Sequence, residues 1–319
     1  MSDTIVKFDF VKNRKIFFTI SIVILLTFLA LYLVEGAVLD VSFKGGTRMS
    51  LECSEMIDAN LADVKLEQAL NKEVNTSVME AVSSEEGTTK KTVILRIDVA
   101  GETPLTADEE QLVRDTLLNE GFPVIIDSPN NEVSSIEPSI GRETLGRGLL
   151  AVVISSILIL VYIALRFRVM GWEAAVCAVV ALIHDCLVMI GVYIAFRIPL
   201  NDVFIATILT IIGYSINDTI IIYDRIRENS GIMKKSDLAT IINVSTWQTL
   251  PRTLKTTGTT LLSLIVLYIF ASANNITSLR DFSLSLTIGC ISGTYSSVLI
   301  AANLWHLWMT GKRKAKANA

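Results

Sequence analysis

Six long apolar runs restrict this chain of 319 residues more firmly than any other feature of its sequence. They are Ile16–Val34, Gly148–Leu165, Ala174–Phe196, Val203–Tyr223, Gly258–Ala271 and Phe282–Trp308. A helix needs about 20 mostly apolar residues to cross a bilayer, and the runs are near that length, the fifth being the shortest. Hydrophobic residues make up 51% of the chain and charged residues 19%, which excludes a disulfide scaffold, a disordered chain and a simple cytosolic enzyme. We therefore predict a bundle of six transmembrane helices.

Charge is distributed unevenly and predicts the topology. Residues 36–143 carry a net charge of −12, the remainder +8 and the whole chain −4. Because basic connections stay inside, both termini are expected in the cytoplasm and the acidic block outside. The acidic balance also offers no basic surface for nucleic acid. The predicted segments are a cytoplasmic N-terminus 1–15, a first membrane helix 16–35, an outer domain 36–145, a five-helix membrane bundle 146–310 and a basic cytoplasmic tail 311–319.

The outer domain shows a β-α-β-β-α-β pattern. Thr106 and Glu109 have the spacing of a capping box, and Gly121 follows the helix that they begin. This order of elements is typical of a small α+β, ferredoxin-like fold. The expected elements are a strand in Val38–Leu51, a helix at Leu61–Leu70, a hairpin of Ser77–Val82 and Thr92–Val99 around the loop Ser83–Thr89, a helix from Thr106 to Glu120 and a strand at Phe122–Ile126.

No catalytic constellation is found in the outer domain. It contains no histidine, and its one cysteine, Cys53, excludes an internal disulfide. Gly45-Gly46-Thr47 interrupts the first predicted strand and is too short for a phosphate-binding loop, so residues alone favour a bulge or turn where the chain leaves the membrane.

Asp218 is the most informative residue of the fourth run. It lies about 22 Å along the helix from the outer end, because each residue adds 1.5 Å. An ionisable side chain at that depth is costly and requires a reason. Burial penalises the charged carboxylate, so Asp218 could load and release a proton, with the non-titrating dipole of Asn217 beside it. The alternative is a static hydrogen-bonded or ion-paired packing residue.

Arg252 precedes the fifth run at its cytoplasmic edge. If the fourth and fifth helices are neighbours, Arg252 lies within reach of Asp218, and protonating the acid would release the arginine. The alternative is a topology residue that extends to the headgroups. The threonines that follow could carry water or join helices, and the amphipathic stretch Ser236–Leu250 could lie on the inner membrane surface.

Three further features lie in the membrane runs. His184 and Asp185 fall near the bilayer centre as a second proton site or, alternatively, as a polar pair that fixes helix packing. Adjacent residues point about 100° apart, so the two are not expected to face one groove. They are also too few to hold a metal ion, and no metal site is expected. Gly289 and Gly293, together with Gly213 in the fourth run, are predicted to permit close helix packing.

Several of these strings together resemble a known family. They are Gly213–Thr219 followed by Asp224–Glu228, the pair His184-Asp185, Phe43–Thr47, and Arg252-Thr253 before a threonine-rich run. They are similar to the SecF-type members of the SecD/SecF family of bacterial protein-export membrane subunits. The resemblance covers essentially the whole chain, including one helix before and five after the outer domain.

The resemblance implies a place in the RND-type superfamily, with SecD supplying six further helices of a pseudo-two-fold unit. It implies a multi-pass protein of the bacterial inner membrane with a periplasmic outer domain. The implied partners are SecD, the SecYEG channel, YajC, preprotein substrates and membrane lipids. The implied activity uses the proton motive force to complete preprotein export, with no cofactor other than transported protons. The family's intramembrane acid matches Asp218, its basic partner matches Arg252, and Gly45, Gly46 and Thr47 become a conformationally required motif.

Two other function classes remain open. An RND-type exporter of small molecules or lipids would need a larger, usually duplicated chain with an outer substrate pocket. A structural scaffold of a channel complex predicts that Asp218 can be replaced without loss of coupling. An enzyme is not expected, because the membrane runs hold no paired-aspartate motif and no Ser/His dyad at plausible spacing.

Overall fold

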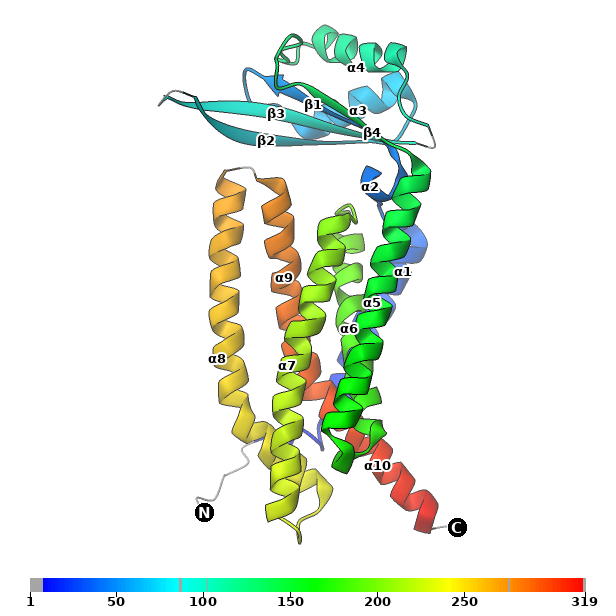
Figure 1. Ribbon diagram of the computed structural model, residues 1–319, viewed down its shortest axis with the longest axis vertical. Coiled ribbons are helices and arrows are strands. Elements are labelled where there is room, and N and C mark those ends of the chain that lie inside the picture. The colour runs from blue at the N-terminus through cyan, green and yellow to red at the C-terminus, as the bar shows by residue number, and fades with distance from the viewer. Residues whose placement is uncertain (1–7, 86–87, 102, 275, 318–319) are drawn as a thin grey trace.

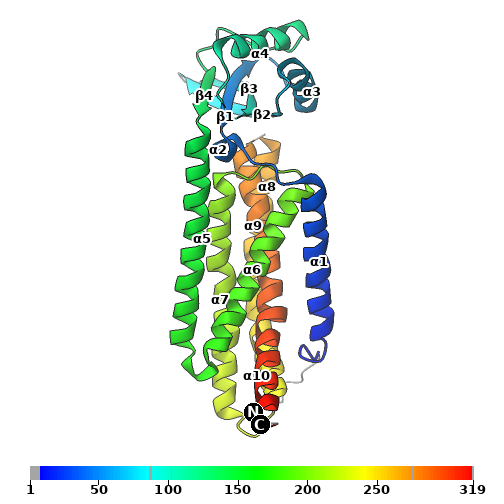
Figure 2. The same cartoon turned by 90° about the vertical axis from the view of Figure 1, so that its right-hand side faces the viewer.

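The computed structural model describes residues 8–317 except 86, 87, 102 and 275. A long helical bundle carries a small α+β domain at one end, called here the sheet side, and both chain termini lie at the opposite, tail side (Figures 1 and 2). The predicted segment 1–15 falls partly outside the described residues, as do the centre of the loop Ser83–Thr89 and the last two residues of the tail.

The bundle contains, among the described residues, six helices long and apolar enough to cross a membrane. One precedes the sheet in the chain and five follow it. The helices are α1 (Arg14–Glu35), α5 (Pro138–Arg166), α6 (Trp172–Ala195), α7 (Asp202–Ile232), α8 (Leu238–Ala273) and a sixth made of α9 (Thr277–Tyr295), the π-helical η2 (Ser296–Ala301) and α10 (Ala302–Ala317), with a short 3₁₀ turn η1 (Arg168–Met170) after α5.

Several helices extend beyond their apolar runs. Helix α5 begins at Pro138, ten residues before the predicted run, because proline at the first helical position fits a helix start and the polar first turns lie toward the sheet domain. The amphipathic stretch Ser236–Leu250 is helical from Leu238 and continuous with the fifth apolar run, because α8 continues through Pro251 to Ala273. The basic tail is likewise helical as far as Ala317.

The small domain is a four-stranded antiparallel sheet with strand order β2-β3-β1-β4. Helices α3 (Ala59–Leu70) and α4 (Ala107–Asn119) cover the face that points away from the bundle (Figure 1). A core of strand and helix residues lies between these layers, including Leu51, Ile97 and Leu117. The strands are β1 (Gly46–Cys53), β2 (Val74–Glu85), β3 (Thr88–Ala100) and β4 (Glu132–Ile136).

Two sequence predictions for this domain are wrong in detail. Phe122–Ile126 forms only an isolated bridge, in which Val124 pairs with Cys53, and the fourth strand is Glu132–Ile136. That strand is short, mostly polar and on an edge of the sheet, so it lacks the apolar alternation that marks a half-buried strand. The segment Val38–Leu51 is not one broken strand, because Val41–Lys44 forms a helical turn, α2, before β1 begins.

Candidate functional site

Asp218 lies inside the bundle on α7 with only 2% of its surface exposed. Among the described residues, no atom hydrogen-bonds its Oδ2 atom and no cationic nitrogen lies within 4.0 Å of the carboxyl group. A buried acid without a partner is rare, because burying a charge costs far more than burying a satisfied polar group. The sequence therefore placed Asp218 correctly inside the bundle.

Helices α7 and α8 are antiparallel neighbours joined by a short turn, and side-chain bonds set their register (Figure 1). Tyr214 Oη donates to Thr257 Oγ1 over 3.3 Å, and Asn229 Nδ2 donates to Ser245 Oγ over 2.8 Å. Asp218 is one turn beyond Tyr214, and Thr253 is one turn before Thr257, so the two lie at the same level of this helix pair. Thr253 is fully buried and its hydroxyl also has no partner among the described residues.

The predicted contact between Asp218 and Arg252 is not made. Arg252 is exposed whereas Thr253, the next residue, points inward, because adjacent side chains on a helix diverge by about 100°. The arginine charge still acts on Asp218 electrostatically. Pro251 lies inside α8 just before it, and a proline there removes one helical hydrogen bond. Arg252 therefore lies on a weakened turn of α8, near the acid but not bonded to it.

Asp185 on α6 is buried to 1% exposure and is, in contrast, fully satisfied. Ser215 Oγ of α7 and Ser296 Oγ of η2 donate to its Oδ2, over 2.8 and 2.7 Å. Ser292 Oγ of α9 donates to its Oδ1 over 2.7 Å. Three helical segments thus converge on one carboxylate, which is the arrangement expected of a group that fixes helix packing.

The π-helical segment η2 extends this polar centre. Ser297 Oγ donates to the Ser215 carbonyl over 3.0 Å and bonds Thr219 Oγ1 over 2.8 Å. A π-helical turn adds a residue to the helix and often marks a functional position. Here the adjacent residues Ser296 and Ser297 bond two different helices, Ser296 the Asp185 carboxylate of α6 and Ser297 the residues of α7.

His184 Nδ1 lies 3.2 Å from Asp185 Oδ1, so the two adjacent side chains contact each other. They do not face one groove, because His184 lines a cavity beside α1 whereas Asp185 faces serines of α7, α9 and η2. The ring stacks on Tyr295, whose hydroxyl donates to the Phe17 carbonyl of α1 over 2.8 Å. His184 Nε2 is buried without a partner among the described residues.

Gly45, Gly46 and Thr47 form the joint between the sheet domain and the bundle. Both glycines have positive φ, +85° and +132°. A Cβ on Gly45 would lie 2.7 Å from Pro138 of α5, and one on Gly46 would overlap the Val99 carbonyl oxygen. Thr47 is fully buried, and its Oγ1 accepts from the Leu105 N–H over 2.8 Å. The motif is therefore a close-packed joint in which only glycine fits at two positions.

A cluster of charges stabilises the same joint. Asp40 caps α2 through Ser42, and Arg48 donates to both of its carboxylate oxygens over 2.8 and 3.1 Å. Burial raises the pKa of Asp40, but the hydrogen bonds from Ser42 and the charges of Arg48 and Arg96 outweigh it and hold that pKa below its usual range. The Asp40 N–H also donates to the Leu200 carbonyl between α6 and α7 over 3.0 Å, which ties the joint to the bundle.

The predicted packing glycines divide into two groups. Gly289 and Gly293 of α9 lie against α7, where a Cβ on the first would overlap Ile211 and one on the second would lie 2.9 Å from Ser215. Gly213 faces open space, with no atom within 4 Å of the position that a Cβ would take, and Asn217, one turn on, is also exposed. The packing role predicted for Gly213 and the place predicted for Asn217 beside Asp218 are therefore not realised within this chain.

The chemistry available at this site is limited by its residues. Among residues 8–317 as described, no group of three or more His, Cys, Asp or Glu could hold a metal ion. The buried polar centre has hydroxyls, two carboxyls and one imidazole. The sequence could not indicate which serines donate hydrogen bonds to Asp185. In sequence, Ser215, Ser292 and Ser296 look like ordinary small residues of apolar helices.

The fold and this centre together define a multi-pass membrane protein with ionisable side chains buried inside its helical bundle. Comparison with known proteins is specific. Residues 121–311 match the C-terminal family model of the protein export membrane protein SecD/SecF. The chain is 31% identical to the protein translocase subunit SecF of Thermobaculum terrenum, covering 94% of this chain and 93% of that protein. The chain belongs to the SecD/SecF family, which confirms the resemblance seen in its motifs.

Larger relatives contain this chain as a part. It is 31% identical to the protein translocase subunit SecDF of Bacillus subtilis, covering 95% of this chain but 38% of the relative. The crystal structure of SecDF from Thermus thermophilus, described as a translocon-associated membrane protein, matches with a TM-score of 0.75 and 26% identity. That match covers 96% of this chain and 39% of the SecDF chain. The chain thus spans about two fifths of the SecDF proteins.

Proposed function

We propose that this chain is an accessory subunit of the Sec protein translocase that couples proton movement through Asp218 to late export of preproteins across the bacterial inner membrane. The names of its SecF and SecDF relatives support the translocase role. The observation that carries the coupling is the buried carboxyl of Asp218, which lacks a bonded partner among the described residues. It lies at the level of the unbonded hydroxyl of Thr253, and the charge of Arg252 acts on it. No cofactor other than the transported proton is needed.

The proposed step is the loading and unloading of this carboxyl. When Asp218 is ionised, it attracts Arg252 on the turn of α8 weakened by Pro251. When a proton neutralises it, the attraction is lost and α7 and α8 repack. A charge that crosses about 100 mV supplies about 2.3 kcal/mol, enough to shift a two-state equilibrium about fiftyfold. The step therefore biases a conformational change without completing it alone.

The joint at Gly45–Thr47 offers a route from the bundle to the sheet domain. Because this joint is packed against α5 and bonded to the connection between α6 and α7, a movement of these helices displaces the domain. We propose that the domain, with the split β-α-β order of a ferredoxin-like fold, lies in the periplasm and holds emerging preprotein there. Both termini then lie in the cytoplasm, with one membrane helix before the domain and five after.

The exposed face of α7 is the proposed contact with SecD. Ala206, Thr210, Gly213 and Asn217 follow one another at helical spacing and are all exposed. Small residues let membrane helices approach closely, and a side-chain amide in hydrocarbon requires a hydrogen-bond partner. The fused SecDF relatives support SecD as that partner. The same proposal includes SecYEG and YajC as further partners. It also treats three segments as functional units: the first membrane helix 16–35, the periplasmic domain 36–145 and the five-helix bundle 146–310.

The test replaces Asp218 by Asn in the complete complex with SecD and SecYEG. Completion of preprotein export in inverted membrane vesicles is expected to lose its stimulation by the proton motive force, by at least tenfold, whereas insertion and assembly remain normal. Asp224→Asn is the matched control, since Asp224 lies on the same helix but is half exposed and paired with Arg166 and Arg227.

The result distinguishes proton coupling through Asp218 from a purely structural role of the chain in the complex. If export by the Asp218→Asn complex is still stimulated by the proton motive force, the coupling proposal fails and a structural scaffold remains. If both variants lose stimulation equally, the effect comes from general loss of charge on α7 and not from the buried site.

A further inference from the structure

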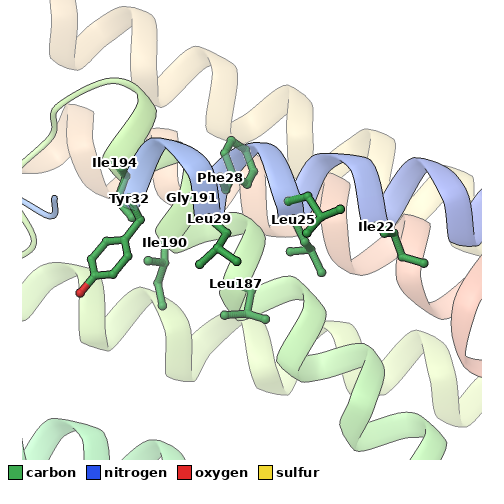
Figure 3. A pocket seen from close by; sticks show the side chains of 10 residues that line it. Ile22, Leu25, Phe28, Leu29, Tyr32, Leu187, Ile190, Gly191 and Ile194 are labelled. Atoms are coloured by element: carbon green, nitrogen blue, oxygen red, sulfur yellow. The ribbon is translucent and has the colours of Figure 1, made fainter. Parts of the chain in front are cut away.

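Helix α1 lies on the side of the bundle away from α5 (Figure 2). An apolar groove runs along it. Two cavities form it. One of ≈ 460 Å³ lies between α1 and α6 near Tyr32 and Ile194 (Figure 3). The other, of ≈ 380 Å³, is lined by α1, α6, η2 and α10 and reaches Leu304 and Leu307. They share Ile22, Leu25 and Leu187 and are therefore continuous.

A further helix does not fit between α1 and α6. Phe28 of α1 packs directly on Gly191 of α6, where a Cβ would overlap the ring. A helix is about 10 Å wide and would have to separate α1 from α6. Flexible chains fit this shape, and the lining side chains are almost all aliphatic or aromatic.

The stretch of α1 from Arg14 to Leu25, at the inner end of the tail-side cavity, is as long as one leaflet is deep. Arg14, Phe18, Ser21 and Leu25 follow at helical spacing and share one face of α1. Leu25 lies 11 residues after Arg14, about 16 Å along the helix, and half of a hydrocarbon core of about 30 Å is about 15 Å. A lipid with its acyl chains beside Leu25 would thus have its headgroup near Arg14.

The polar side chains in the cavity lining, Ser21 and His184, carry no guanidinium or ammonium group for a phosphate. Ser21 Oγ is used in a bond to Tyr295, and His184 Nε2 is one ring nitrogen without a partner among the described residues. The polar end of a ligand must therefore lie at the tail-side mouth. Arg14, half buried there, donates to the Val11 carbonyl and makes no ion pair with a described carboxylate.

Further charged groups lie at the same end of the bundle as Arg14. Arg14 and Arg313 both act electrostatically on His306 of α10, together with one acid, Asp237. Lys15 is exposed beside Arg14. A guanidinium group matches a phosphate in geometry and charge. We propose that this groove binds an anionic phospholipid of the tail-side leaflet, with its acyl chains along α1 and its phosphate at Arg14.

The test measures lipid retention on the purified full chain by native mass spectrometry. The protein is incubated with equimolar mixed micelles of phosphatidylglycerol and phosphatidylcholine. One phosphatidylglycerol is expected to remain bound with at least fivefold preference. Arg14→Gln should reduce this preference about fivefold or more, whereas Arg168→Gln, which removes an exposed cation at the same end after α5, should leave it unchanged.

A second variant separates the groove from the headgroup site. Leu187→Trp fills the point that both cavities share, and because Leu187 is 45% exposed the larger side chain can be accommodated. Retention is expected to fall although Arg14 is present. Equal retention of both lipids, equal effects of Arg14→Gln and Arg168→Gln, or no effect of Leu187→Trp would each overturn the proposal. Release of the lipid when SecD is added would also overturn it, because the groove would then be a protein interface.

Discussion

Asp185 and Asp218 lie on neighbouring helices of one bundle and are equally buried, yet their surroundings differ completely. Asp185 accepts hydrogen bonds from serines of three helical segments. Within the part of the chain that the structure describes, Asp218 has no bonded partner, and the hydroxyl of Thr253 at its level is unbonded as well. A satisfied carboxylate holds its neighbours in one arrangement, whereas an unsatisfied one is stable only if it changes its protonation or its surroundings. The contrast separates a packing residue from a coupling residue within the same membrane.

The largest effect is expected when Asp185 loses its carboxyl. Asp185→Ala leaves three buried serine hydroxyls without their acceptor and is expected to destabilise the bundle by about 3–5 kcal/mol, the cost of breaking a buried charged network. Asp218→Asn removes a group with no bond to lose and should be neutral or stabilising. Thermal unfolding in detergent compares the stability of the two variants. Equal losses of stability would contradict the distinction between Asp185 as a packing residue and Asp218 as a coupling residue.

Replacing single serines measures how much each hydrogen bond to Asp185 contributes to the stability of the bundle. Ser296→Ala removes one hydrogen bond to a carboxylate and is expected to cost about 1.5–3 kcal/mol. Ser263→Ala is the control, because Ser263 is exposed and bonds only the Thr259 carbonyl of its own helix, and should stay within about 0.5 kcal/mol of the parent. If Ser296→Ala and Ser263→Ala change the stability equally, the hydrogen bond from Ser296 of η2 to Asp185 does not stabilise the bundle.

The sequence could predict the membrane helices because a bilayer imposes a length of about 20 apolar residues on each. It could not predict that α5 begins at Pro138 or that α8 continues through Pro251, since polar turns outside the hydrocarbon have no such signal. Asp218 could be singled out because any acid at that depth requires a reason. The partners of Asp185 could not, because they are 30 to 111 residues away in the chain.

In the sheet domain, capping residues such as Thr106 predicted a helix start correctly, because this signal is local. The edge strand Glu132–Ile136 was missed, because its pairing with β1 depends on residues distant in sequence. The direction of Arg252 was also missed. Its spacing from the fourth run was compatible with a contact, but only the rotation of α8 decides which of two adjacent residues points inward.

Asp40 extends the comparison to a third buried carboxylate, one paired with cations outside the membrane helices. Because its pKa in the folded chain lies below the ordinary value of 3.8, its contribution to stability is present above about pH 4 and is lost as the pH falls through the folded pKa. Asp40→Asn is expected to lower the stability of β1 by about 1–2 kcal/mol at pH 7, with the difference from the parent vanishing at low pH. Hydrogen exchange at Gly46–Cys53 measures this, and a difference that persists under acid conditions would show that charge is not the cause.

The smallest effect on stability, and the sharpest test of the contrast, is expected at Thr253. Thr253→Val keeps the shape and removes a buried hydroxyl that has no partner among the described residues, so stability should change by less than about 0.5 kcal/mol. If that hydroxyl holds a water molecule against Asp218 during proton transfer, loss of a bridge worth about 1 kcal/mol slows coupled export about fivefold. Thr249→Val, one turn earlier, is the control, since its hydroxyl bonds backbone carbonyls of α8. An unchanged export rate in Thr253→Val would show that the Thr253 hydroxyl is not part of the proton route, and the route would then have to reach the acid from the exposed Asn217 face.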